Sequence, residues 1–342
     1  MTTAGPSQGG NAPLGGSDPH QMGERGGRSL RTRVQRRPVH GVLLLDKPLG
    51  LSSNDALQKA KWLLRAEKAG HTGTLDPLAT GVLPLCFGAA TKFSQLHLDA
   101  DKTYEAVALL GVKTSTGDAE GEVIAERAVH VTPEQLAEVV GQFTGRIRQI
   151  PPMHSALKKD GKALYEYARA GIEVERAPRE IEICELNVHP APANGSKFAI
   201  QIKVKCSKGT YIRTLAEDIG EALGCGAHLT ALRRVATGDF EVSQCVTLEA
   251  LEGMDDAARL ACLKPVESLL PDHEPVLLDD ENAGRFLSGV RRRGNWHDNA
   301  HVAVFGTQPR ALLGTAHVKA GELIPGRLLS PPEIQQILER TP

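Results

Sequence analysis

Alternating apolar and polar positions predict several strands along this chain. Ile200, Ile202 and Val204 alternate with lysine and glutamine, which predicts a half-buried strand with a basic outer face. A continuous apolar run, such as the one that begins at Gly41, is typical of a buried strand. Strands are predicted on these grounds at residues 41–46, 83–87, 102–111, 198–206 and 229–240, with shorter ones at 302–305 and 312–318.

Helices are predicted where apolar residues recur at intervals of three and four and a capping signal stands before them. Residues 132–135 form a capping box with proline at the first helical position. The apolar residues from Ile212 to Leu223 share one helical face, and Gly224 follows as a stop signal. Helices are expected at residues 52–64, 133–143, 210–223 and 255–270.

The elements divide the chain into three parts. Residues 1–38 are rich in Gly, Ser, Pro and Arg without apolar periodicity, which predicts a disordered basic tail. Residues 39–271 hold most of the predicted elements, interrupted at 145–178 by a long basic excursion of the kind that usually has a function. Residues 272–342 contain short strands among glycines and predict a small β-rich domain. The overall prediction is an α+β fold.

Composition narrows the class of protein without identifying its partner. The 342 residues are 41% hydrophobic but contain no long apolar run, so we expect a globular protein that does not span a membrane. Six cysteines are spread out with no C-x-x-C pair, which suggests neither disulfides nor a zinc site and favours the cytoplasm. The net charge of -1 neither supports nor excludes nucleic acid, because an average conceals local basic patches.

One carboxylate stands out as candidate chemistry. Asp76 lies in the run HTGTLDPLATGVL at residues 71–83, between two glycines and before a proline, with small or apolar neighbours. A single carboxylate with few local charge partners suits a catalytic acid displayed on a turn. The alternative is that Asp76 caps a helix, since aspartate before proline commonly opens one. The local pattern leaves both interpretations open.

Two further motifs carry candidate side chains. Residues 206–215 end a basic strand, turn at Gly209 and begin a helix whose first turn carries Tyr211 and Arg213. Helix N-termini favour anions, so this corner suits a phosphate or a carboxylate. Arg213 opposes the helix dipole and needs a partner, for which Asp76 is a candidate. Tyr104 opens another strand, where an aromatic is ordinarily a core residue. The turn at 116–121 lacks the pattern of a calcium loop.

Together these motifs resemble the bacterial tRNA pseudouridine-55 synthases of the TruB family, over about residues 40–270. The resemblance implies a catalytic domain with a mixed, mainly antiparallel sheet flanked by helices, a thumb-like RNA-binding insertion at 145–178 and a PUA-like module at 272–342. It implies that Asp76 is catalytic, that Arg213 pairs with it and that Tyr104 stacks on the target uracil. The other active-site or substrate-binding residues that it implies are Tyr211, His71, Lys47 and Leu232.

The resemblance also implies the reaction, which is isomerisation of uridine 55 to pseudouridine in the tRNA T loop. The uracil flips out, the N1–C1′ bond breaks and the base rejoins through C5. No atoms enter or leave, so neither a cofactor nor a metal is expected. We expect the tRNA T arm as partner, no guide RNA, no membrane and a monomer. The alternatives are a guide-RNA-dependent pseudouridine synthase and an RNA-binding protein, and a tRNA-folding activity can accompany isomerisation.

Overall fold

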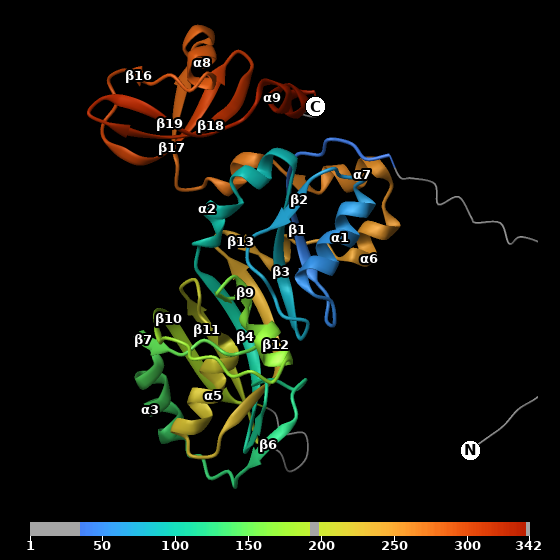
Figure 1. The fold of residues 1–342 in the computed structure, drawn as a ribbon, viewed down its shortest axis with the longest axis vertical. Helices are drawn as coiled ribbons and strands as arrows, with labels where there is room; N and C mark the ends of the chain where they lie inside the picture. Colours follow the sequence, from blue (N-terminus) through green and yellow to red (C-terminus); the bar gives the residue numbers. More distant parts are fainter. Residues whose placement is uncertain (1–34, 192–197, 340–342) are drawn as a thin grey trace, which may run out of the picture. The chain divides into compact units, whose positions relative to one another are not determined.

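The computed structural model describes residues 35–191 and 198–339, and the residues from Arg36 onward form a single unit (Figure 1). The predicted basic tail lies almost entirely outside the described residues. The unit contains two larger sheets and two short hairpins. Within the described ranges, no helix is long and apolar enough to cross a membrane. The boundary predicted between 39–271 and 272–342 stays a prediction.

The larger sheet has the strand order β14-β1-β3-β12-β4-β11-β10-β7, with β2 beside β3 and β13 beside β12. Neighbouring strands are antiparallel except β3 and β12, which confirms the mixed, mainly antiparallel sheet. The strands are β1 (Gly41–Lys47), β2 (Ala69–His71), β3 (Ala79–Phe87), β4 (Lys102–Leu110), β7 (Gly145–Gln149), β10 (Arg179–Pro190), β11 (Ala199–Cys206), β12 (Ala227–Thr237), β13 (Phe240–Glu241) and β14 (Leu263–Lys264).

The alternation in β11 gives the sheet two different faces. Ile200, Ile202 and Val204 are buried, while the residues between them are exposed. Helix α5 (Ile212–Ala222) covers the apolar face and packs against β12. Where the chain returns from α5, a Cβ on Gly220 would lie 2.4 Å from the backbone of Ala227, so this close approach requires glycine. The opposite face of these strands carries the polar side chains.

Other helices flank the sheet as the capping signals predict. Helix α1 (Ser53–Leu63) begins after Ser52, whose hydroxyl accepts a hydrogen bond from the Asp55 amide. Helix α3 (Pro133–Phe143) has the predicted capping box and lies against β10. The remaining helices and 3-10 turns of this region are η1 (Gly88–Lys92), α2 (Ser94–Leu98), η2 (Val242–Gln244), α6 (Leu248–Gly253), α7 (Asp256–Ala261) and η3 (Val266–Leu269).

Two sequence predictions need correction. The expected single helix at 255–270 is instead α7, the strand β14 and the turn η3, because β14 pairs with β1 and Pro265 cannot continue a helix. The long strand β10 was not predicted at all. A register irregularity between Ile183 and Glu185 interrupts its alternation, so the apolar period is out of phase in its two halves.

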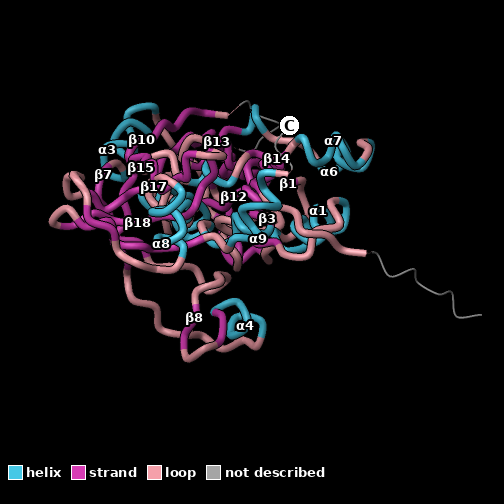
Figure 2. Tube along the Cα trace, turned by 90° about the horizontal axis from the view of Figure 1, so that it is seen from above, coloured by secondary structure: helices cyan, strands magenta, loops and turns pink. Residues whose placement is uncertain are grey.

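The basic excursion is shorter than predicted. Residues 145–149 form β7, an edge strand paired with β10, so the excursion begins only after Gln149. Beyond it come a hairpin of β8 (Lys158–Lys159) and β9 (Lys162–Ala163) and the short helix α4 (Leu164–Arg169). Figure 2 shows β8 and α4 set apart from the sheet at the ends of loop segments. A second hairpin, β5 (Val112–Thr114) with β6 (Val123–Glu126), follows β4.

The C-terminal part has a five-stranded sheet of its own, which confirms the predicted β-rich region. The strand order is β15-β17-β18-β19-β16, and Phe286, Val304 and Leu323 are buried in its core. That this region is a PUA-like module remains a prediction. Its elements are β15 (Glu274–Leu278), α8 (Asp280–Leu287), β16 (Arg292–Arg293), β17 (Asn299–Thr307), β18 (Arg310–Lys319), β19 (Glu322–Leu328) and α9 (Pro331–Leu338).

Candidate active site

Asp76 lies on a tight turn between β2 and β3, and no helix follows it. The alternative that Asp76 caps a helix is therefore wrong, because Ala79 already begins a strand. The turn is attached to α1: the Leu75 amide donates to the Ser53 hydroxyl at 2.7 Å, and that hydroxyl donates to the Leu75 carbonyl at 3.0 Å. Gly73 has a φ of +82°, a conformation that favours glycine. This framework holds the carboxylate in a defined position.

Arg213 is the direct partner of Asp76. Its Nη2 lies 2.9 Å from Asp76 Oδ2, so the contact suggested by the sequence is present. The same guanidinium donates to the carbonyls of Thr116 at 2.9 Å and His154 at 2.7 Å. Only 6% of the Arg213 side chain is exposed, whereas 43% of the Asp76 side chain is exposed. The buried Arg213 guanidinium therefore holds the Asp76 carboxylate in a fixed orientation, while the carboxylate itself remains accessible.

A second carboxylate, Asp118, completes this arrangement and was missed by the sequence reasoning. Its Oδ2 lies 3.7 Å from Arg213 Nε, and its side chain is only 5% exposed. Its other oxygen accepts hydrogen bonds from the Thr116 hydroxyl and the Glu120 amide. The polar turn at 116–121 was the available signal, but nothing local to it indicates contact with α5. Asp118 supplies a buried counter-charge for Arg213, which leaves Asp76 available to the cavity.

These residues open into one cavity of about 610 Å³. Six of the seven predicted site residues line it: His71, Asp76, Tyr104, Tyr211, Arg213 and Leu232. Leu232 and the aromatic ring of Tyr104 supply apolar and aromatic surface beside the carboxylate. The excursion after β7 contributes residues 154–157 to the same cavity. The structure thus brings together groups from β2, β4, α5 and β12.

Lys47 is the predicted site residue that the structure does not present to the cavity. It is fully buried, and its ammonium donates to the carbonyls of Pro48 at 2.9 Å and Leu51 at 2.6 Å. Burial lowers the pKa of Lys47 to about 8, and the negative charge of Asp76 opposes that change. The position fits support of the loop beside the site rather than contact with a substrate.

Tyr211 occupies a position slightly different from the predicted one. It is the N-cap of α5 and has an extended backbone, so it precedes the first turn rather than lying within it. The Gln149 side chain makes two hydrogen bonds to the backbone of Tyr211. It accepts one from the Tyr211 amide at 2.8 Å and donates one to the Tyr211 carbonyl at 3.1 Å. Burial raises the pKa of Tyr211. The last residue of β7 therefore anchors the start of α5.

Two buried cations that the sequence did not single out also line the cavity. Arg234 lies two residues after Leu232 on β12, and Lys102 begins β4. Burial, with Arg234 adding to it, lowers the pKa of Lys102 to about 8 and also lowers the pKa of His71. The sequence prediction included Leu232 but neither of the two arginines that follow it, because strand register decides which of them faces this cavity.

Similarity to solved structures establishes the class of fold. A chain in the "Crystal Structure of a Cbf5-Nop10-Gar1 Complex" matches with a TM-score of 0.59 and 26% identity, over 90% of this chain and 82% of that chain. A chain in the "Structure of H/ACA RNP bound to a substrate RNA containing 2'-deoxyuridine" matches with a TM-score of 0.61 and 23% identity, over 85% and 86%. The chain has the fold of the pseudouridine synthases.

Sequence comparison establishes the family. The model "TruB family pseudouridylate synthase (N terminal domain)" matches residues 61–212, and "tRNA pseudouridylate synthase B C-terminal domain" matches residues 213–271. "tRNA pseudouridine synthase B" of Verminephrobacter eiseniae is 66% identical over 91% of this chain and 95% of its own length. The protein of the same name from Cupriavidus pinatubonensis is 59% identical over 87% and 96%. The chain belongs to the TruB family of pseudouridylate synthases.

Proposed function

We propose that this protein isomerises uridine 55 to pseudouridine in the T loop of tRNA, with Asp76 as the essential group. The family supplies the reaction class. The observation that carries the assignment of roles is the half-exposed Asp76 carboxylate, held at 2.9 Å by buried Arg213 in a cavity that also contains Tyr104. A charged, oriented carboxylate beside an aromatic ring suits a reaction that cleaves a bond between a sugar and a base.

The reaction creates a demand that Asp76 can meet. When the N1–C1′ bond breaks, positive charge develops at the sugar, and a nearby carboxylate stabilises or attacks that charge, as carboxylates do in glycoside chemistry. The uracil then turns and joins C1′ through C5. The C5 proton leaves and N1 gains a proton, so the overall composition is unchanged. Arg213 orients the carboxylate, while Asp118 balances part of the arginine charge.

The target base must leave its stack to reach Asp76. The cavity is lined by Tyr104, on which a base can stack, and by apolar Leu232. Stacking on an aromatic side chain is worth about 1–3 kcal/mol per base. RNA loops open more readily than helices, which favours a loop substrate such as the T arm.

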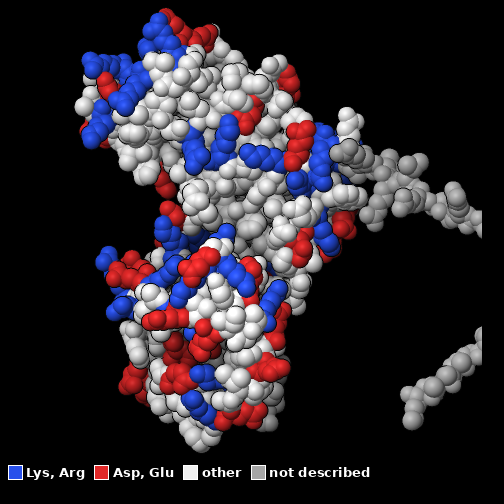
Figure 3. Space-filling model, viewed as in Figure 1, with Lys and Arg blue, Asp and Glu red and all other residues white. Residues whose placement is uncertain are grey.

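The proposed partner is tRNA alone, bound by a monomer in the cytoplasm without a guide RNA. The titles of the two similar structures describe complexes with further proteins or RNA, but this chain carries the basic segment from Lys158 to Arg169 beside its cavity. Lys158, Lys159 and Lys162 of that segment can bind phosphates. We assign the thumb role to the excursion predicted at 145–178, which begins after Gln149 and contains this segment, and an RNA-binding role of the PUA type to residues 272–342. Figure 3 shows acidic and basic side chains intermixed over one face, which suits local phosphate contacts more than a uniformly basic surface.

Site-resolved pseudouridine mapping tests the proposal. An unmodified tRNA transcript is incubated with the purified protein alone, and every uridine is then examined. We expect one new pseudouridine, at position 55. A transcript with cytidine at that position is the matched control and should remain unmodified. Modification only after addition of a cellular RNA fraction would instead support a guide-dependent enzyme. Binding without modification under either condition would support an RNA-binding protein.

A further inference from the structure

Two adjacent arginines of β12 have opposite environments. Arg233 faces the exposed side of the sheet and pairs with Asp46, at 2.6 Å. Arg234 is 1% exposed and lines the active-site cavity. Its Nε donates to the Val82 carbonyl at 2.7 Å and its Nη2 to the Gly73 carbonyl at 3.3 Å. Arg234 therefore ties the turn that carries Asp76 to the neighbouring strand β3.

Arg234 differs from the other arginines of this region in its charge balance. Arg213 has two carboxylates within 4 Å and Arg233 has one, but within residues 35–191 and 198–339 no ion pair includes Arg234. Burying a guanidinium without a counter-charge is costly, and carbonyl groups offset only part of that cost. A group that becomes negative during the reaction would benefit from this cation.

The phenol of Tyr104 is such a group. Tyr104 and Arg234 are register partners on adjacent strands β4 and β12, both line the same cavity, and the Arg234 guanidinium opposes the rise in the pKa of the phenol. The other groups that act on the phenol are Cys206 from β11 and Asp76 from its turn. Burial raises the pKa of the Cys206 thiol to about 12, so this group stays neutral. Asp76 disfavours a phenolate, whereas Arg234, the register partner of Tyr104, favours one.

We propose that Arg234 is a positioning residue that enables Tyr104 to act as the general base of the isomerisation. This inference rests on the proposed function. After C5 has joined C1′, the Tyr104 phenolate takes the C5 proton, and the electron pair of the C–H bond restores the C5–C6 double bond. Tyr104 becomes a neutral phenol, and N1 takes a proton from solvent. The phenol then returns its proton to solvent, which completes the balance.

The direct test measures the titration of Tyr104, without any turnover. The chain has four tyrosines, so a protein labelled with 3-fluorotyrosine gives few fluorine resonances, and Tyr104→Phe identifies the one that belongs to Tyr104. Burial raises the pKa of Tyr104 and Arg234 opposes that rise. In Arg234→Met we therefore expect the titration midpoint of Tyr104 to increase by about one pH unit or more. Arg233→Met, one residue away on the opposite face, should leave the midpoint unchanged.

A kinetic test links this titration to the reaction. Single-turnover formation of pseudouridine should slow by about 10-fold or more in Arg234→Met. The loss should not exceed the roughly 10²–10⁴-fold that general acid–base catalysis supplies. The deuterium isotope effect with uridine labelled at C5 should increase, because proton removal becomes limiting. With 5-fluorouridine in the transcript there is no C5 proton to remove, so carbon–carbon bond formation should proceed at nearly the wild-type rate.

The outcomes separate the two proposals. An unchanged Tyr104 midpoint in Arg234→Met, or equal losses with uridine and 5-fluorouridine, overturns the role of Arg234. If Arg234→Met does not fold, Arg234→Lys keeps the charge but loses the planar hydrogen bonds. We then expect the titration midpoint of Tyr104 to move by less than in a neutral variant and the isotope effect to rise. If both quantities stay at their wild-type values, the role of Arg234 is overturned. A wild-type protein that leaves uridine 55 unmodified contradicts the proposed function, whereas the fluorine titration does not depend on it.

Discussion

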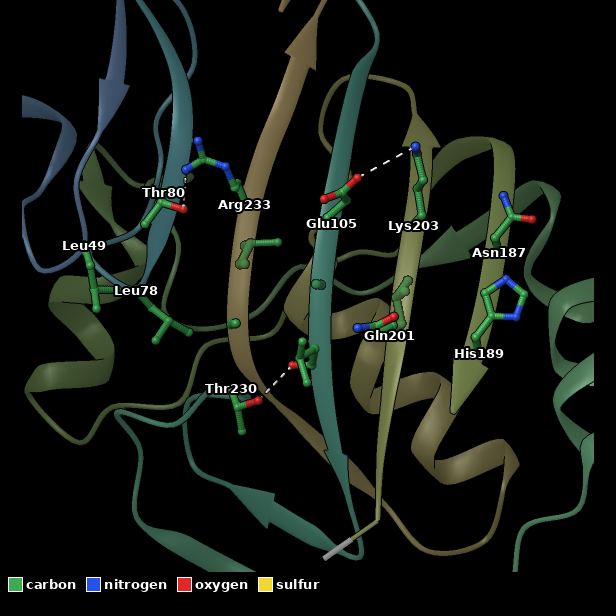
Figure 4. A pocket seen from close by; sticks show the side chains of 15 residues that line it. Leu49, Leu78, Thr80, Glu105, Asn187, His189, Gln201, Lys203, Thr230 and Arg233 are labelled. Atoms are coloured by element: carbon green, nitrogen blue, oxygen red, sulfur yellow. Dashed lines mark hydrogen bonds and ion pairs between the residues drawn. The ribbon is translucent and has the colours of Figure 1, made fainter. Parts of the chain in front are cut away.

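The two faces of the central sheet differ in how their charges are balanced. Figure 4 shows the exposed face of β12, β4, β11 and β10. The hollow in this face has a volume of about 760 Å³, compared with about 610 Å³ for the cavity that contains Asp76. Its charges are paired: Glu105 lies 3.7 Å from Lys203, and Arg233 binds Asp46 and donates to Thr80. On the opposite face, Asp76 is half exposed and Arg234 has no carboxylate partner among the described ion pairs.

The comparison teaches that charge balance distinguishes the two faces more clearly than the size of a hollow does. Paired surface charges cost little and contribute little, because water screens both members. Buried or oriented charges without full compensation are costly, and a fold that holds them has a use for their electric field. Substitutions of the same chemical kind on the two faces should therefore have very different effects.

The largest expected effect is that of Asp76→Asn. Removing the negative charge while keeping the shape should lower the rate of pseudouridine formation by at least about 10³-fold. Binding of the tRNA transcript should remain largely intact, because phosphate contacts dominate affinity. Single-turnover kinetics and filter binding measure the two quantities. Asp46→Asn is the same change on the exposed face and should retain nearly full activity. Equal loss of binding and activity in Asp76→Asn would contradict the catalytic role.

Arg213→Met should have the next largest effect, on stability. The side chain is 6% exposed and its loss leaves buried Asp118 without its cation, which typically costs about 3–5 kcal/mol. Urea denaturation measures this cost as a lower unfolding midpoint. Arg285→Met removes an exposed pair with Glu281 and should cost less than about 1 kcal/mol. Similar costs for the two variants would show that Asp118 does not depend on Arg213.

A pH effect should distinguish buried Lys47 from a surface lysine. Because folding lowers the pKa of Lys47 from 10.5 to about 8, the unfolded chain binds more protons between these values. The free energy of unfolding of the wild type should therefore rise with pH in this window, relative to Lys47→Met. The upper value of this change is about 3 kcal/mol. Chemical denaturation at several pH values checks it, with Lys59→Met, a change at an exposed position of α1, as the control variant.

The smallest effect is expected for the charge pair on the exposed face. Replacing Glu105 and Lys203 singly and together should give a coupling energy below about 1 kcal/mol, since both side chains are more than half exposed. The pair should also have no effect on pseudouridine formation. A larger coupling, or lost activity, would mean that this face takes part in the function and that the contrast between the faces is incorrect.

Much of the fold was predictable because its signals are local. The capping box at Thr132, the alternation in β11 and the stop at Gly224 each involve residues within a few positions of one another. Predictions were wrong where distant pairing overrides local pattern. Strand β14 forms because β1 provides hydrogen-bond partners, and β10 was missed because its bulge breaks the apolar period.

The sequence by itself determined which residues had the chemistry for the site. The motifs around Asp76, Tyr104 and Arg213 identified the family and most of the cavity lining, because each motif is short and compositionally unusual. The contact of Asp76 with Arg213 could be suggested because an arginine at the start of a helix opposes the helix dipole and needs an anionic partner. It could not be established, since nothing local brings the two segments together.

Only the tertiary structure decided which of those charged residues pair with one another and which are buried. It buried Asp118 against Arg213, withdrew Lys47 from the cavity and turned Arg234 toward Tyr104 while Arg233 faced the other way. The physical reason is strand register: successive side chains always point to opposite faces, but long-range pairing and the position of α5 decide which face is buried. Burial in turn sets the electrostatic environment. It therefore separates two neighbouring arginines: Arg233 forms an ion pair near the surface, and Arg234 is a buried cation beside the cavity.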